Sequence, residues 1–345
     1  MLPLDSSQWH DTLTKNQELW CGFVQDLVIN PRDEYNKSMG RHGGGGGGVE
    51  EGDMVEPQSQ EAGEESDDHP LSLDRKSTWN AYFKDCELQA EIKKDVTRTF
   101  PTLHFFRQGS DPHLESLGRI LFIWCKLNPG VSYVQGMNEV LGPLYYLFAI
   151  SPANQKCRAA AESQAFFCFM NLMSEIMNNF IKTLDGSEMG IVHQIRLLSQ
   201  LLQEKDPQLW KDLEKKKLNL QFFALRQLTL LLSQEFELPD VLRLWDTLFS
   251  DSNRFELLRY CCCAMLMLQR ETLLRGDFAE NLKLMQSYPP TDIENIINYA
   301  LELATNTELE PPFLDLDIIP NAADTASGAS ASSNLGTTPS SQASS

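Results

Sequence analysis

A helical repeat of apolar residues is the feature that most constrains the fold. From about residue 77 to residue 304, apolar side chains recur every three or four positions, and Gly and Pro separate the stretches. The sequence lacks the apolar–polar alternation of half-buried strands, and no hairpin signal of weight is present. We therefore predict an all-α body of roughly ten to thirteen helices joined by short connections.

The spacing also predicts where individual helices lie. We expect a first helix over residues 5–29, capped by Asp5 or Ser6, and two short helices over 77–84 and 87–97. The remaining helices are predicted over residues 111–127, 163–184, 190–203, 207–217, 222–234, 239–249, 255–269, 278–285 and 292–305. In the stretch 132–150, a mostly apolar helix is expected to follow a polar motif that contains Gln135.

Two segments have a different composition. Residues 36–76 contain six consecutive glycines, Gly43 to Gly48, followed by nine acidic residues and no basic residue over 50–68. Residues 306–345 are rich in Ser, Ala and Thr. Neither segment can bury enough apolar surface to offset the entropy of ordering it, so we predict a disordered Gly-rich, acidic insertion and a disordered tail. The folded parts are then 1–35 and 77–305.

The charge distribution argues against nucleic acid as a partner. The chain has a formal net charge of -19, but residues 78–304 hold 23 Lys and Arg against 27 Asp and Glu, a balance of -4. No strongly basic domain is present to neutralise phosphates. The longest apolar stretch, Val140–Ile150, is too short to span a bilayer, which needs about 20 residues.

The eight cysteines form no CxxC pair, and the six histidines have no paired spacing near them. This pattern indicates reduced, buried thiols in a cytosolic protein and does not favour a zinc site. We expect no metal and no cofactor bound by the chain itself.

Three short patterns carry residues capable of chemistry. Asp95 and Arg98 lie three residues apart, so they can meet on one helix face, either as an ordinary surface ion pair or with Asp95 holding the arginine outward. Tyr133, Gln135, Gly136 and Asn138 form the second pattern. A side-chain amide such as that of Gln135 can donate to phosphate and accept from water, and Gly136 permits close approach to the backbone.

The third pattern comprises Arg243, Trp245, Asp246 and Phe249. Trp245 and Phe249 belong to an apolar stripe and are expected in the core. Arg243 and Asp246 are three residues apart and can brace a site or simply each other.

Together, the three ordered patterns resemble the TBC domain of Rab GTPase-activating proteins. They match Ile-x-x-Asp-x-x-Arg at Ile92, Asp95 and Arg98, then Tyr-x-Gln-Gly-x-Asn and Arg-x-Trp-Asp-x-x-Phe at the residues named above. The resemblance covers about residues 77–304, with residues 1–31 as an N-terminal helical part. The acidic insertion and the start of the chain also resemble one particular member of that family.

The resemblance implies a V-shaped domain of two helical subdomains that docks on a GTP-bound Rab. It implies that Arg98 and Gln135 act as an arginine finger and a glutamine finger, supported by Asp95, Tyr133, Gly136 and Asn138 and, from the third pattern, Arg243, Trp245 and Asp246. GTP and Mg²⁺ would come with the Rab, so the chain would not itself be a GTP hydrolase. A cytoplasmic activator recruited to membranes through its Rab, and acting in vesicle trafficking, is the expected role.

One departure from the family pattern concerns the start of the chain. Family members usually begin with a Gly-hydrophobic-Pro segment followed by Arg and Trp, and nothing similar precedes Trp9. The sequence therefore suggests an N-terminally shortened form whose folding needs testing.

Two alternatives to an activator are compatible with the same helices. One is an adaptor that binds a GTPase without accelerating hydrolysis, and the other is a purely structural helical scaffold. The scaffold predicts that Arg98 and Gln135 do not converge, whereas the activator requires both side chains to be exposed at one site.

Overall fold

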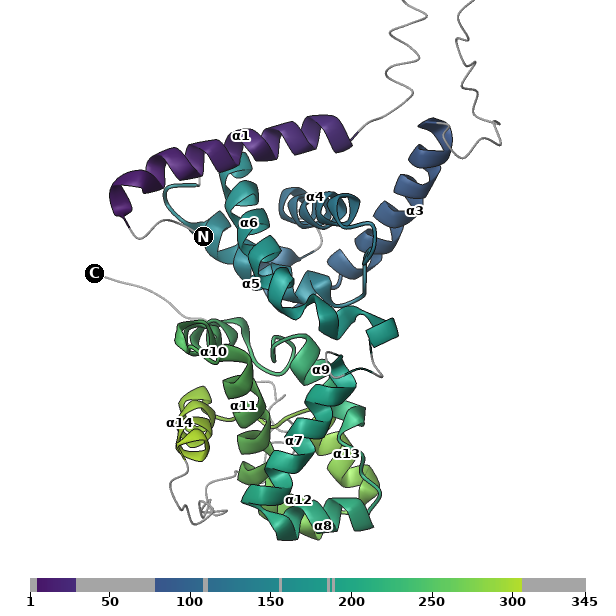
Figure 1. Cartoon of the computed structure of the whole chain (residues 1–345), viewed down its shortest axis with the longest axis vertical. Helices are drawn as coiled ribbons and strands as arrows, with labels where there is room; N and C mark the ends of the chain where they lie inside the picture. Colours follow the sequence, from purple (N-terminus) through teal and green to yellow (C-terminus); the bar gives the residue numbers. More distant parts are fainter. Residues whose placement is uncertain are drawn as a thin grey trace, which may run out of the picture. The chain divides into compact units, whose positions relative to one another are not determined.

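The computed structural model describes residues 5–28, 78–107, 111–154, 157–184, 187 and 190–305 (Figure 1). All of them belong to the first of two compact units, Met1–Thr307 and Glu308–Ser345. Within the described residues, regular structure is helical throughout, which confirms the predicted all-α class. The predicted insertion 36–76 and the predicted tail 306–345 lie outside the described residues.

The helices follow one another with short connections. The α-helices of the described residues are α1 (Trp9–Leu27), α3 (Thr78–Val96), α4 (Asp111–Leu127), α5 (Met137–Ile150), α6 (Arg158–Ile176), α7 (Ile191–Lys205), α8 (Pro207–Lys215), α9 (Gln221–Thr229), α10 (Leu238–Ser250), α11 (Arg254–Leu268), α12 (Arg270–Arg275), α13 (Phe278–Gln286) and α14 (Ile293–Ala304). The described residues also contain the 3₁₀ helix η1 (Ser6–Gln8), which leads into α1, and three further 3₁₀ helices in the connections, η2 (His104–Phe106), η3 (Met177–Phe180) and η4 (Lys182–Leu184).

The start of the body differs from the prediction. A single helix, α3, replaces the two short helices predicted over 77–84 and 87–97. The intervening residues contain neither Gly nor Pro, so nothing interrupts the helix. Asp85, at the predicted break, accepts two 2.8 Å hydrogen bonds from Lys126 of α4, which ties the middle of α3 to its neighbour.

The segment after α9 also differs. We predicted a helix to Gln234, but α9 ends at Thr229. Leu231 and Leu232 then adopt positive φ angles of 52° and 61°, a backbone conformation that residues other than glycine rarely adopt. The indole nitrogen of Trp245 in α10 donates a 2.9 Å hydrogen bond to the Leu231 carbonyl. A contact from the following helix therefore stabilises a turn that local propensity does not favour.

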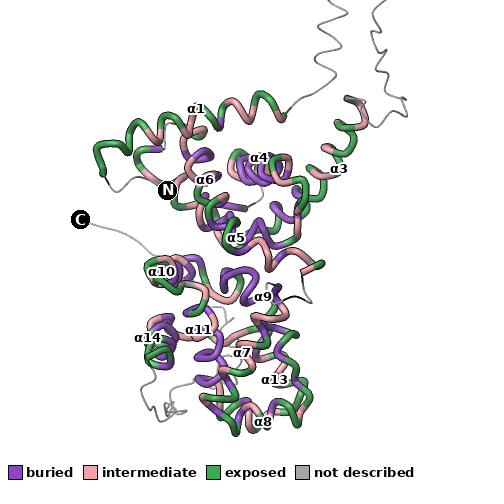
Figure 2. The backbone as a smooth tube through the Cα atoms, in the orientation of Figure 1, coloured by how far each residue is buried: buried purple, intermediate pink, exposed green. Residues whose placement is uncertain are grey.

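The buried apolar residues form one core cluster that draws on helices from α1 to α14, and Figure 2 shows buried residues on α4, α5 and α11 among others. The consecutive thiols Cys261, Cys262 and Cys263 are buried in α11, as predicted, and burial raises the pKa of Cys261 and Cys263 to about 12. They are therefore neutral core residues. Cys21, Cys86 and Cys168 are exposed, so the prediction of buried thiols fails for those three.

The N-terminal helix α1 packs on α4 and α6. The Trp20 ring lies 5.0 Å from the Phe166 ring, and its indole nitrogen donates to Glu162 at 3.3 Å. The same Glu162 carboxylate accepts from Ser116 at 2.6 Å and from Arg119 at 2.7 Å. One buried acid thus connects three helices.

We searched the described helices for a membrane-spanning segment, and none combines the necessary length and apolar character.

Candidate functional site

The site is built where α3 ends and α5 begins. Arg98 lies two residues beyond the last residue of α3, and the following Phe100 has a positive φ of 41°, which turns the chain away from the helix axis. The Arg98 side chain is 57% exposed. The arginine is therefore presented to solvent from a turn whose backbone is held by the helix end.

Asp95 is the anchor of this arginine. Its carboxylate, only 9% exposed, accepts from Arg98 Nη2 at 2.5 Å through one oxygen and from the Tyr133 hydroxyl at 2.8 Å through the other. Burial raises the pKa of Tyr133 far above its usual range, so the phenol remains a neutral donor. Asp95 and Arg98 therefore form the predicted pair, and Tyr133 braces it.

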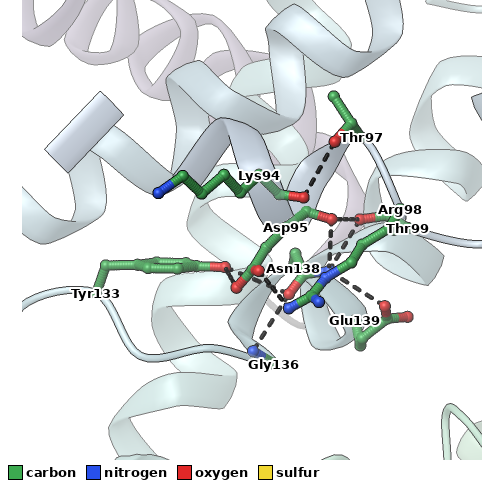
Figure 3. A network of polar contacts seen from close by, with 9 residues as sticks. All are labelled: Lys94, Asp95, Thr97, Arg98, Thr99, Tyr133, Gly136, Asn138 and Glu139. Atoms are coloured by element: carbon green, nitrogen blue, oxygen red, sulfur yellow. Dashed lines mark hydrogen bonds and ion pairs between the residues drawn. The ribbon is translucent and has the colours of Figure 1, made fainter. Parts of the chain in front are cut away.

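Asn138 connects the arginine turn to the glutamine turn (Figure 3). Its Oδ1 accepts from the Gly136 backbone N–H at 3.2 Å. Its Nδ2 donates to Thr99 Oγ1 at 2.9 Å and lies 3.4 Å from the Asp95 carbonyl. One buried side chain thus holds the residue after Gln135 and the residues on both sides of Arg98.

Gln135 is exposed, and among the described residues its amide makes no hydrogen bond. The adjacent Gly136 has φ 105°, and a Cβ atom there would lie 2.7 Å from Leu230 Cδ2. The backbone can therefore follow this path only because position 136 carries no side chain. This geometry presents the Gln135 amide to solvent beside the network.

The third pattern contributes through Trp245 alone. Trp245 is buried and holds the Leu231 carbonyl, in the turn whose Leu230 side chain packs on Gly136. Arg243 pairs at 2.6 Å with Glu294 of α14 and not with Asp246. Asp246 is exposed and has no hydrogen bond or ion pair within the described part of the chain. The structure therefore leaves Arg243 and Asp246 outside the network.

Sequence reasoning missed two members of the network. Thr99 accepts from Asn138 and donates to the Asp95 carbonyl at 3.2 Å. The available sequence signal was its position four residues after Asp95, where a threonine hydroxyl can donate to the backbone carbonyl one turn earlier. Glu139, only 6% exposed, accepts from Asn138 at 3.1 Å, and burial raises its pKa. No local pattern distinguishes Glu139 from a surface glutamate in the first turn of a helix.

The arrangement offers an exposed cation and an exposed amide on a rigid, buried base. A guanidinium binds phosphate oxygens through several N–H groups, and an amide can orient a water molecule. In the described ranges, no three His, Cys, Asp or Glu side chains cluster so as to hold a metal ion.

Comparisons with known proteins identify the family of the chain. The family model for the Rab-GTPase-TBC domain matches residues 55–274. TBC1 domain family member 13 from Homo sapiens is 39% identical over 365 residues, which cover 88% of this chain and 86% of that protein. It is the member that the start and the acidic insertion were predicted to resemble. TBC1 domain family member 5 from Mus musculus is 28% identical over 346 residues, covering 88% of this chain and 39% of that protein.

A solved structure shares the fold. The crystal structure of the YPT/RAB-GAP domain of Gyp1p superposes with a TM-score of 0.65 at 22% identity, covering 88% of this chain and 83% of that one. The family model matches more than half of the chain, and the sequence patterns and helical architecture agree with it. The chain therefore belongs to the Rab-GTPase-TBC domain family.

Proposed function

We propose that this chain is a GTPase-activating protein for a Rab-family small GTPase in its GTP-bound form, and that it supplies Arg98 and Gln135 in trans. The observation that carries the proposal is the position of Asn138, which hydrogen-bonds beside both residues at once. The buried Asn138 side chain thereby connects the two turns that carry these exposed side chains.

Arg98 is suited to insertion into a partner's nucleotide site. Its ion pair with Asp95 uses only Nη2, so the other guanidinium N–H groups remain available for phosphate oxygens. Anchoring by Asp95 also reduces the conformational entropy lost on docking. The cation would neutralise charge on the transferring phosphoryl group, a contribution of about 10³–10⁵ in rate when a small GTPase receives such an arginine.

Gln135 would position the attacking water in place of the GTPase's own glutamine. Its amide can accept a hydrogen bond from water while donating to the phosphate. In this proposal, Mg²⁺ and GTP are bound by the Rab, and the chain reaches membranes through the Rab. A cytoplasmic protein regulating vesicle trafficking is the corresponding cellular role.

The test is single-turnover GTP hydrolysis across a panel of GTP-loaded Rabs. We expect the chain to accelerate at least one Rab, and Arg98→Ala and Gln135→Ala each to abolish most of that acceleration. Arg107→Ala and Gln203→Ala are matched controls, because both residues are exposed and lie outside the network. These controls should accelerate hydrolysis as well as the unaltered chain does.

Two outcomes would contradict the proposal. Binding of a Rab without acceleration by the folded chain would favour a non-catalytic adaptor. Acceleration that survives both Arg98→Ala and Gln135→Ala would place the catalytic groups elsewhere.

A further inference from the structure

Gly142 is a buried glycine in the interior of α5, one turn after Asn138. Glycine is less favourable than alanine inside a helix, so a packing contact has to account for it. A Cβ atom at position 142 would lie 2.8 Å from Phe100 Cε2, 3.1 Å from Phe100 Cδ2 and 3.2 Å from Thr99 Cγ2. The two residues that follow Arg98 therefore fill the space that a side chain at position 142 would occupy.

These neighbours have little room to move away. Thr99 is fully buried, and its hydroxyl accepts from Asn138 at 2.9 Å and donates to the Asp95 carbonyl at 3.2 Å. The Phe100 ring stacks on the buried ring of Phe106, with 6.1 Å between the ring centroids. A separation of 2.8 Å is about 0.6 Å short of ordinary van der Waals contact, which begins at 3.4 Å. An added methyl group would therefore displace both neighbours together.

The same packing holds the turn that presents the arginine. The backbone N–H groups of Arg98 and Thr99 each donate to a carbonyl of the last turn of α3 at 3.1 Å. Phe100 then adopts its positive φ, which is strained for a residue with a side chain and persists only where surrounding contacts hold it. The position of the Phe100 ring between Gly142 and Phe106 is such a contact.

We propose that Gly142 is a positioning residue for Arg98: the absence of a side chain at position 142 lets Thr99 and Phe100 pack directly on α5, and this packing sets where the guanidinium meets a partner's phosphate. The inference rests on the proposed function. Enlarging position 142 displaces the arginine turn while Arg98 and Gln135 both keep their side chains.

The first measurement is kcat and KM for Rab GTP hydrolysis by the unaltered chain and by Gly142→Ala. We expect kcat to fall between about tenfold and about a hundredfold, since a misplacement of about 1 Å can cost about a hundredfold in rate. KM should stay close to that of the unaltered chain, because the arginine acts in the transition state. Gly118→Ala is the matched control, since a Cβ there meets no atom within 4 Å, and both constants should be unchanged. An unchanged kcat in Gly142→Ala would overturn the inference while the activator function stands.

Two second-site substitutions separate the Phe100 contact from a local effect of Pro143. A side chain at position 142 also crowds the ring of the following proline. Phe100→Leu removes the aromatic ring and keeps an apolar side chain, so adding it to Gly142→Ala should restore part of the lost kcat, with Phe100→Leu alone as the reference. Adding Pro143→Ala to Gly142→Ala should restore none. Recovery with Pro143→Ala, or no recovery with Phe100→Leu, would overturn the inference.

A second measurement needs no GTPase. Amide hydrogen exchange at Arg98 and Thr99 reports the opening of the two backbone hydrogen bonds that hold the turn. Both amides should exchange faster in Gly142→Ala, and at their usual rates in Gly118→Ala. Unchanged exchange in Gly142→Ala would overturn the inference whether or not a Rab is accelerated. Faster exchange, together with no acceleration of any Rab by the unaltered chain, would contradict the proposed function and leave the packing of Gly142 on the arginine turn standing.

Discussion

At the scale of single residues, the site depends on buried polar groups that each satisfy several partners. Asp95 shares its two oxygens between Arg98 and Tyr133. Tyr133→Phe keeps the ring but removes one donor from a buried carboxylate. We expect a loss of about 1–3 kcal/mol in the free energy of unfolding, the usual cost of a buried acceptor left unpaired.

Urea denaturation measures that loss. Tyr146→Phe is the matched control, because Tyr146 makes ring contacts but no hydrogen bond in the described structure, and it should change stability by less than about 0.5 kcal/mol. Equal effects of the two substitutions would show that the Tyr133 hydroxyl does not stabilise Asp95.

Glu139 also makes stability depend on pH. Its pKa is raised in the folded chain, so over the range from its unfolded value to its folded value the folded state binds more protons than the unfolded state. Stability should therefore fall as pH rises through that range. In Glu139→Gln this decrease should be smaller, as measured by urea unfolding at several pH values. An unchanged slope in Glu139→Gln would assign the decrease to another buried acid such as Glu235, whose pKa burial also raises.

At the scale of elements, the site is formed by turns at helix ends. The Leu230 side chain packs on Gly136, and Trp245 holds the neighbouring Leu231 carbonyl. Gly136→Ala should cost about 1–2 kcal/mol for its left-handed backbone, and the contact with Leu230 should add to that cost. Combining it with Leu230→Ala should relieve the contact but not the backbone strain.

The cycle is read from unfolding free energies. The double variant should be destabilised by less than the sum of the single variants. Gly118→Ala is the control, because a Cβ there meets open space in α4, and it should be neutral or stabilising. If the effects of Gly136→Ala and Leu230→Ala on the free energy of unfolding are additive, the Leu230 contact is not the reason why position 136 carries a glycine.

At the scale of the whole molecule, α1 is an integral part of the described body although the family model begins after it. Trp20→Ala removes the ring on Phe166 and one donor to Glu162. We expect a loss of about 3–5 kcal/mol, typical of a large aromatic deleted from a core. Leu19→Ala, at an exposed position of the same helix, should have little effect. A loss below about 1 kcal/mol for Trp20→Ala would mean that α1 is not part of the cooperative unit.

Most helices, the Asp95–Arg98 pair and the family could be predicted from the sequence, because each depends on residues close together in the chain or on ordered short patterns. Gln135 and Gly136 were recognised for the same reason, but the left-handed backbone of Gly136 was not predicted. The early end of α9 was not predicted, since the bond from Trp245 to Leu231 spans fourteen residues. Neither was Glu139, whose burial depends on how α5 packs.

By itself, the sequence determined the all-α class and the identity of the residues exposed at the site. Only the tertiary structure decided that Asn138 binds beside both Arg98 and Gln135, that Trp245 supports the glutamine turn, and that Arg243 pairs with Glu294 instead. The physical reason is the separation along the chain over which each kind of interaction acts. Helix periodicity and ion pairs at three residues act within one turn, whereas hydrogen bonds between residues about forty apart exist only after the helices have packed.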